Sequence, residues 1–305
     1  MPLFLGNKRQ AADRLVGCFC KGDAMMDVNI LSHQQVLDML PERKPDAHKG
    51  DFGRILLLCG SRGYTGAAFF VAMGALRSGA GLVYLGVPES IYAIEAVKLS
   101  EPIVFALPEE NGMLSKAAMP AVRDRLSGMD AVVIGCGWGQ SEGTLTVLEL
   151  VLREFAGPVV IDADGINLLA QHKNILRGRT GITILTPHTG ELARLGYSGD
   201  RLSTSLSAAR DLGCILLLKG HKTLVTDGNV VYENHTGNPG MATGGCGDVL
   251  AGMIGSLVGQ GILALQATAA AAWLHGRAGD VCAEELGQYG MLPSDMLLAL
   301  PRLMK

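Results

Sequence analysis

The stretch Asn238-Pro-Gly-Met-Ala-Thr-Gly-Gly-Cys-Gly-Asp248 combines closely spaced glycines with a single carboxylate, just ahead of an apolar run that predicts a helix. Glycines allow positive φ and a close approach of the main chain to a ligand. The first N–H groups of a helix lack partners inside the helix and carry partial positive charge, so they attract anions. The stretch therefore predicts a phosphate site at residues 244–247.

Asp248 is unexpected in a site that only binds phosphate, because a carboxylate repels phosphate. A hydroxyl group that attacks a phosphoryl group must lose its proton, and a nearby carboxylate is a suitable base. Under the alternative interpretation Asp248 caps the helix and the glycines shape a turn, since Asp is favoured in a first helical turn. This stretch alone leaves both interpretations open.

The elements that must position this loop follow from the apolar runs. From residue 49 onward predicted strands alternate with predicted helices, and a hairpin over 224–233 precedes the loop. Such alternation is typical of a parallel, doubly wound sheet with ligands at the carboxyl ends of its strands. We therefore predict a three-layer α/β/α fold with a mostly parallel central sheet and helices on both faces. The predicted strands span 53–59, 82–87, 102–107, 131–134, 158–161, 181–185 and 214–218, and the predicted helices span 32–40, 67–78, 90–98, 115–126, 142–155, 202–212 and 249–258.

Two groups of candidate residues directly follow predicted strands. Gly135, Gly137 and Gly139 allow a close approach to a ligand, or they form only a tight turn. Their spacing is not that of GxGxxG, and no GxxxxGK[ST] occurs, which disfavours a dehydrogenase or a P-loop enzyme. We interpret Asp164 as the cap of a helix that begins near residue 165. Whether Asp162 contacts a polar ligand stays open.

Other candidates lie at further strand ends and at one helix start. His188 follows the strand over 181–185 and favours substrate contact, while Glu191 either caps the next helix or holds a metal-bound water. Lys219 ends a buried strand and should point to an anion, because an unpaired buried ammonium group is costly, unless it reaches solvent. Ala67 begins a helix among small residues, which leave room for a planar ligand or simply pack.

Composition narrows the classes of function. The 305 residues are 48% hydrophobic and 18% charged with a formal net charge of -3, which disfavours nucleic acid and anionic membranes as partners. Seven cysteines without CxxC spacing and the lack of a signal-peptide pattern indicate a reduced, cytoplasmic protein. The apolar run over 249–274 is interrupted by Gly259-Gln-Gly261, which predicts two buried helices rather than a membrane span.

We predict two regions along the chain. Residues 1–44 are expected to form an N-terminal extension with a short helix started by Ser32, and residues 45–305 are expected to form one domain. The first two dozen residues are weakly patterned and read as a loose extension, and Met25 or Met26 is an alternative natural start.

Taken together, several segments resemble the ADP/ATP-dependent NAD(P)H-hydrate dehydratases of the ribokinase-like superfamily. The segments that carry this resemblance are 49–53, 63–67, 162–165, 186–188, 219–220 and 238–248. The resemblance implies a ribokinase-like fold and a hydro-lyase that repairs the S-epimer of NADH or NADPH hydrated at C6. A nucleotide, with ADP favoured over ATP, would phosphorylate the C6 hydroxyl after Asp248 takes its proton, and loss of phosphate would restore the ring.

The resemblance also assigns roles to individual residues. It implies that Mg²⁺ bridges the phosphates and that Glu191 orders one of its waters. Cys246 stands where the family usually has Thr, and Cys136 where it usually has Pro. The positions that match hydrate-contacting residues are Ala67, Gly137, His188 and Asp248, and those that match nucleotide-contacting residues are Lys219, Gly220, His221, Lys222, Thr223, Gly244, Gly245, Cys246 and Gly247.

Two other functions are compatible with the same loop. A ribokinase-like kinase of the hydroxyethylthiazole or hydroxymethylpyrimidine type would release a phosphorylated product. A nucleotide-binding protein without catalysis would gain nothing from the Asp248 carboxylate. The resemblance further implies a homotetramer, and with about 45 residues ahead of the match we expect a separate epimerase to act on the same substrate pool.

Overall fold

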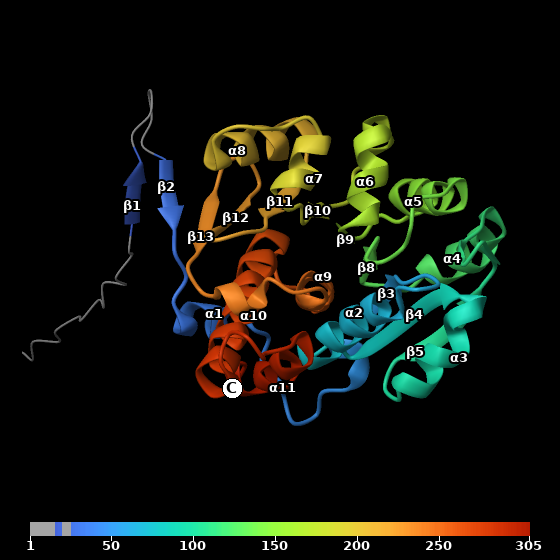
Figure 1. Ribbon diagram of the computed structural model, residues 1–305, viewed down its shortest axis with the longest axis horizontal. Coiled ribbons are helices and arrows are strands. Elements are labelled where there is room, and N and C mark those ends of the chain that lie inside the picture. Colours follow the sequence, from blue (N-terminus) through green and yellow to red (C-terminus); the bar gives the residue numbers. More distant parts are fainter. Residues whose placement is uncertain (1–15, 20–25) are drawn as a thin grey trace, which may run out of the picture.

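A mixed sheet of eleven strands organises the chain (Figure 1). The computed structural model describes residues 16–19 and 26–305, where the strand order is β1-β2-β13-β12-β11-β10-β9-β8-β3-β4-β5. All neighbours from β11 to β5 pair in parallel, whereas β12 is antiparallel to both β11 and β13. The strands are β1 Val16–Phe19, β2 Met26–Asn29, β3 Arg54–Leu58, β4 Leu82–Pro88, β5 Ile103–Leu107, β8 Ala131–Ile134, β9 Val159–Ile161, β10 Thr183–Leu185, β11 Ile215–Leu218, β12 Thr223–Thr226 and β13 Val231–Asn234, with a separate hairpin of β6 Glu109–Glu110 and β7 Met113–Leu114.

Helices cover both faces of this sheet, and Figure 1 shows the two groups on opposite sides. One face carries α1 His33–Met39, α2 Thr65–Arg77, α3 Glu89–Lys98, α9 Cys246–Gly259, α10 Ala264–Leu286 and α11 Pro293–Leu303. The other carries α4 Met119–Leu126, α5 Glu142–Glu154, α6 Asp164–Gln171, α7 Thr189–Arg194 and α8 Arg201–Leu212. Short 3-10 helices are η1 Lys49–Phe52, η2 Lys116–Ala118, η3 Lys173–Leu176 and η4 Pro239–Met241.

The central strands are continuously apolar because they are buried on both faces. In β3 the side chains of Ile55 and Leu57 belong to one hydrophobic cluster, and those of Leu56 and Leu58 belong to the other. Successive side chains of a strand point to opposite faces, so each strand supplies both cores. The mostly parallel sheet between two helical layers confirms the predicted fold class.

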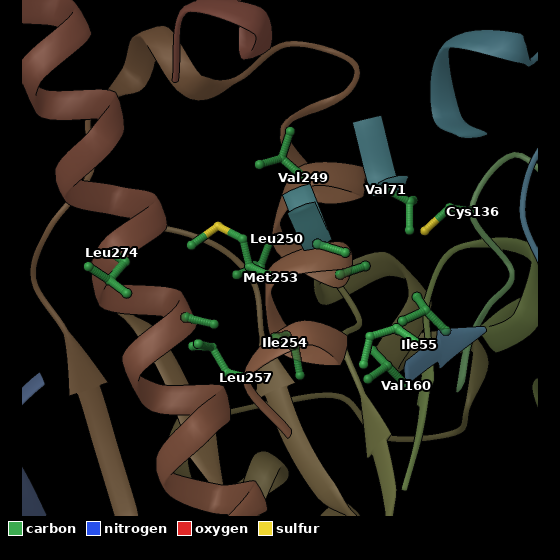
Figure 2. Close-up of a cluster of buried hydrophobic side chains, with 14 of the residues drawn as sticks. Ile55, Val71, Cys136, Val160, Val249, Leu250, Met253, Ile254, Leu257 and Leu274 are labelled. Carbon is green, nitrogen blue, oxygen red and sulfur yellow. The ribbon is translucent and has the colours of Figure 1, made fainter. Parts of the chain in front are cut away.

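Helix α9 is the most deeply packed element of its layer, and Figure 2 shows its apolar side chains within that cluster. An added Cβ at Gly252 would lie 2.1 Å from the carbonyl oxygen of Val71, and one at Gly74 would lie 2.4 Å from that of Val249. The glycines therefore let the backbones of α2 and α9 approach closely. This contact fixes where the start of α9 points.

The N-terminal region differs from the prediction. Strands β1 and β2 were not predicted, yet β2 pairs in parallel with β13, with Val28 opposite Val231. The predicted short helix is confirmed as α1, with Ser32 accepting from the Gln35 N–H in a capping box. Of the two suggested natural starts, Met25 lies outside the described residues and Met26 is the first residue of β2, so the natural start stays a prediction. The division at residue 45 also stays a prediction. No helix among the described residues is long and apolar enough to cross a bilayer.

One predicted helix needs correction, and another prediction is confirmed. The helix predicted over 115–126 consists of η2 followed by α4. The apolar run over 249–274 forms α9 and α10, which are separated by a turn after Gly259, as predicted.

Candidate active site

The predicted phosphate loop forms the entrance to α9. Gly245 is the N-cap of this helix with φ of 102°, and an added Cβ would come within 2.8 Å of a packed aromatic ring. Glycine is therefore required here by both conformation and space. The N–H group of Val249 donates to Gly245 O at 3.1 Å, so those of Cys246, Gly247 and Asp248 precede the helical hydrogen-bond ladder. This is the geometry of an anion site.

Asp248 lies in the first turn of α9 and is half-buried. Burial raises the pKa of its carboxyl group to about 6, and the charge of Asp162 adds to the rise, while the Cys136 thiol and the charge of Lys219 oppose it. A carboxyl group with this pKa is mostly ionised at pH 7 and is a stronger base than an exposed one. Asp248 therefore does not behave as a solvent-facing cap, and its surroundings suit a general base.

Lys219, which follows β11, carries a positive charge beside this loop. Its Nζ donates to Asp162 Oδ1 at 2.7 Å and lies 3.8 Å from Glu191 Oε2. Burial acts to lower the pKa of Lys219, but the two carboxylates raise it overall, so the ammonium group stays charged. An added Cβ at Gly247 would lie 3.7 Å from Lys219 Nζ, which places the ion pair at the α9 entrance. Lys219 does point to an anion, and that anion is Asp162.

The loop after β8 lies between two other strand ends. Gly137 has φ of 57°, and an added Cβ would come within 2.6 Å of the Ala67 Cβ at the start of α2. Gly135 has φ of 111°, and a Cβ there would lie 2.2 Å from Asp162 O. These close approaches bring Ala67 and Gly137, both predicted to contact substrate, face to face. Their role in binding stays a prediction.

Asp164 does not cap the helix in the way that the sequence predicts. The N-cap of α6 is Ala163, which has no side-chain cap, and Asp164 is the first helical residue. Its Oδ2 accepts from the Gly139 N–H at 2.8 Å instead. The prediction was wrong because the carboxylate bonds a distant loop, and sequence spacing cannot show a partner so far along the chain.

His188 is the N-cap of α7. Its Nδ1 accepts from the N–H groups of Gly190 at 3.0 Å and Glu191 at 3.3 Å. In return Glu191 Oε2 accepts from the His188 N–H at 2.8 Å, so Glu191 has the capping role that the sequence allowed. The His188 ring is half exposed, at 51% of its side chain. One nitrogen is thus used by the cap, and Nε2 faces the Glu191 carboxylate at 3.6 Å.

The segment predicted to bind nucleotide continues from Lys219 into a tight turn. Gly220 has φ of 144°, and its carbonyl accepts from Thr223 Oγ1 at 2.9 Å. His221 is exposed, and Lys222 Nζ lies 3.6 Å from a carboxylate oxygen of Glu233. Gly220, His221 and Lys222 therefore lie on one exposed turn beside Lys219, and Thr223 is the half-buried first residue of β12.

Cys246 contributes its main chain to the loop, and its thiol also has a hydrogen bond with the Thr243 main chain. The side chain is buried, and its Sγ lies 3.8 Å from Met296 Sδ. Burial raises the pKa of this thiol to about 11, so it stays protonated. The Cys in place of the usual Thr therefore leaves the amide in position but directs its side chain into the core.

Sequence reasoning missed two residues that support the site. Arg201, the first residue of α8, donates to the carbonyl oxygens of Leu218 and His221 and so braces the nucleotide turn. An arginine at a helix N-terminus opposes the helix dipole, and this was a usable signal. Burial lowers the pKa of His275 in α10 to about 4, and its ring bonds the Cys246 main chain from behind. No sequence pattern places His275 there.

The sequence and fold of this chain are similar to those of known proteins. The sequence model of a family described as NAD(P)H-hydrate dehydratase matches residues 55–302. The chain is 42% identical over 275 residues to the bifunctional NAD(P)H-hydrate repair enzyme Nnr of Moorella thermoacetica, covering 87% of this chain and 52% of that protein. It is 38% identical over 256 residues to the ADP-dependent (S)-NAD(P)H-hydrate dehydratase of Neisseria meningitidis, covering 80% and 82%. The chain thus spans about half the length of most of the curated relatives that it matches.

Solved structures agree with these sequence relationships. The ADP/ATP-dependent NAD(P)H-hydrate dehydratase of Bacillus subtilis, co-crystallised with ATP/Mg²⁺, is 29% identical with a TM-score of 0.78, over 90% of this chain and 97% of that one. A hydroxyethylthiazole kinase from Pyrococcus horikoshii, which covers 83% of this chain and 89% of its own, shares the fold alone, at 18% identity and a TM-score of 0.59. The family match covers the sheet from β3 onward, the α9 loop and every strand end described above, though not β1 and β2, and the chain belongs to the NAD(P)H-hydrate dehydratase family.

Proposed function

We propose that this chain dehydrates the S-epimer of hydrated NADH or NADPH, using ADP in preference to ATP as the phosphoryl donor. The observation that carries the proposal is the position of Asp248. Its carboxylate lies in the first turn of α9, among the main-chain N–H groups that suit a phosphate, and its pKa of about 6 suits a base. The named activities of the similar proteins support the substrate.

The proposed reaction has two stages. Asp248 takes the proton of the C6 hydroxyl while the hydroxyl oxygen attacks the terminal phosphoryl group of the nucleotide. The N–H groups of residues 244–247 and the Lys219 ammonium group stabilise the charge that develops on the phosphoryl oxygens. The ring nitrogen then supplies its electron pair, the C6–O bond breaks, and phosphate leaves. Loss of a proton from C5 restores the double bond. A hydroxyl is a poor leaving group and a phosphate ester a good one, so the nucleotide makes the elimination possible.

We infer that Mg²⁺ enters with the nucleotide rather than through a preformed protein site. Within residues 16–19 and 26–305 no three His, Cys, Asp or Glu side chains gather to hold a metal. Glu191 already accepts from the His188 N–H and lies 3.8 Å from Lys219 Nζ. The nucleotide phosphates would therefore supply most of the ligands, and Glu191 would order a metal-bound water. The metal would neutralise charge on the phosphates.

The decisive experiment is recovery of the near-ultraviolet absorbance of reduced nicotinamide from hydrated NADH. We expect recovery with ADP or ATP present, together with release of one phosphate per dinucleotide repaired. The alternative is a small-molecule kinase of the same fold, which would leave a stable phosphorylated alcohol. No recovery, alongside phosphorylation of a thiazole or pyrimidine alcohol, would overturn the proposal. Nucleotide binding without either product would indicate a binding protein.

The quaternary and cellular setting is also a proposal. The family resemblance supports a homotetramer in the cytoplasm. It also supports a separate epimerase that interconverts the two epimers of the hydrate and so supplies the S-epimer as substrate. Size-exclusion chromatography with light scattering measures the oligomeric state. Adding an epimerase to a mixture of both epimers of the hydrate tests whether repair depends on epimerisation. Complete repair of both epimers without an added epimerase would contradict the need for one.

A further inference from the structure

The segment between β13 and the phosphate loop of residues 244–247 lies along α10. Asn234 Nδ2 donates to Ala272 O at 3.1 Å, and Thr236 Oγ1 donates to Trp273 O at 2.9 Å. An added Cβ at Gly276 would lie 2.2 Å from Thr236 Oγ1, so glycine at this position leaves room for the segment. Helix α10 therefore supports the part of the chain that leads into the α9 entrance.

Asp280 lies one turn further along α10, on the same face as Gly276. It is half-buried, and both of its carboxylate oxygens are bonded to this segment. Oδ2 accepts from the Gly237 N–H at 3.0 Å, and Oδ1 accepts from Asn238 Nδ2 at 3.0 Å. A carboxylate forms stronger hydrogen bonds than a neutral acceptor, so Asp280 attaches the segment firmly to α10.

Asn238 carries this attachment toward the phosphate loop. Its Oδ1 accepts from the Gly240 N–H at 3.0 Å, so its amide oxygen faces η4 and its NH2 group faces Asp280. Its main-chain oxygen accepts from the Met241 N–H at 3.1 Å, and the Thr243 N–H donates to Met241 O at 2.8 Å. A continuous series of hydrogen bonds therefore runs from α10 through η4 to the residue directly before the phosphate loop.

We propose that Asp280 is a positioning residue that holds the phosphate loop, through Asn238, in the arrangement that binds the nucleotide. This inference deepens the proposed function and rests on it. Asp280 bonds the main chain and Asn238 rather than the reacting groups, so it acts through the loop. A glycine-rich loop has much conformational freedom to lose when it closes around an anion, and fixing it beforehand lowers the cost of binding.

The geometry requires a side chain at position 280 that only accepts hydrogen bonds, because two donors face it. In Asp280→Asn the new NH2 group would face either the Gly237 N–H or the Asn238 NH2 group. In Asn238→Asp two carboxylates would face each other. The double variant Asn238→Asp/Asp280→Asn restores every bond and keeps the formal charge of the pair. Its amide at 280 accepts from Gly237 and donates to the carboxylate at 238, which still accepts from Gly240.

The test measures the dissociation constant for ADP with Mg²⁺ by calorimetry on the full chain. Each single variant should bind ADP about tenfold more weakly, since a lost hydrogen bond to a charged group changes an equilibrium constant by that order. The double variant should return to within about threefold of wild type. KM for ADP should follow the dissociation constant, whereas kcat at saturating ADP should change less, because bound nucleotide restores the loop.

Asp227→Asn is the matched control. The Asp227 Oδ1 accepts from the N–H groups of Asn229 and Val230, both at 2.8 Å, in the hairpin between β12 and β13. Thr226 pairs with Leu216 near the start of β11, so this hairpin lies at the opposite edge of the sheet from the site. The control also weakens a bonded carboxylate, but its dissociation constant for ADP should equal that of wild type.

A second measurement needs no ligand. In protein labelled with ¹⁵N-glycine, the amide signals of Gly244, Gly245 and Gly247 should move in both single variants and return in the double variant. Single variants that bind ADP like wild type, or a double variant that is unfolded or binds no better than they do, would overturn the inference. An unfolded single variant leaves this comparison with the double variant in force. If hydrated NADH is not repaired but the glycine signals still follow the exchange, the proposed function fails and the positioning role stands.

Discussion

Replacing Asp248 by Asn should make the protein more stable and nearly inactive. The carboxyl pKa is raised from 3.8 to about 6 in the folded chain, mainly by burial. Because the folded pKa is above the unfolded one, protonated Asp248 favours folding below pH 3.8, and this contribution is lost as the pH rises through 6. At pH 7 the ionised carboxylate therefore costs about 3 kcal/mol of unfolding free energy. Asn resembles the protonated acid and avoids most of that cost.

The predicted gain depends on pH in a way that other causes do not reproduce. Integrating the proton linkage between the two pKa values predicts how much unfolding free energy Asp248→Asn gains over wild type. The gain is about 3 kcal/mol at pH 7 but only about 0.5 kcal/mol at pH 4, where the carboxyl group of the folded wild type is already protonated. Urea denaturation of Asp248→Asn and wild type at both pH values measures the difference. Asp46→Asn, on an exposed loop, serves as the control and should change little at either pH.

Activity supplies the second half of this prediction. Loss of a general base should lower kcat by roughly 10²- to 10⁴-fold, while nucleotide binding by the main-chain N–H groups is retained or strengthened, because a repulsive charge has been removed. Equal stability of Asp248→Asn and wild type at pH 7, or a gain that is the same at pH 4, would refute the electrostatic argument. Undiminished turnover would remove Asp248 from the mechanism.

Four further substitutions test the site. Lys219→Met leaves Asp162 buried without its cation, so the unfolding free energy should fall by about 3–5 kcal/mol and nucleotide affinity should drop; an unchanged urea midpoint would contradict this. Gly245→Ala combines φ of 102° with a 2.8 Å contact and should lower the melting temperature, whereas Gly244→Ala, with no atom within 4 Å of the added methyl group, should not. Gly137→Ala should raise KM for hydrated NADH with little effect on KM for ADP, and equal effects on both would show that the loop serves nucleotide binding too.

Much of the fold could be predicted because each central strand is apolar on both faces. The predicted helices also alternate with these strands at regular spacing. The predicted strand over 131–134 and the helix over 142–155 correspond closely to β8 and α5. Strands β1 and β2 escaped prediction because each has only four residues, and β2 joins the rest of the sheet through its pairing with β13. Pairing with a strand about 200 residues away leaves no local pattern.

Part of the candidate site could also be read from residue types. Glycines beside Asp248 at a helix start have a local physical meaning, and so has a lysine at the end of a buried strand. The same reasoning failed for Asp164, whose partner is the Gly139 N–H, and left Asp162 undecided. The choice among cap, ion pair and ligand contact depends on which loop lies opposite.

By itself the sequence determined where glycine, carboxylate and ammonium groups occur relative to strand ends, since backbone freedom and hydrophobic periodicity act over a few residues. Only the tertiary structure decided that Lys219 neutralises Asp162, that His188 caps its own helix, and that burial moves the Asp248 pKa to about 6. Those properties are set by distance and desolvation, and both arise when strand ends far apart in the chain meet at one edge of the sheet.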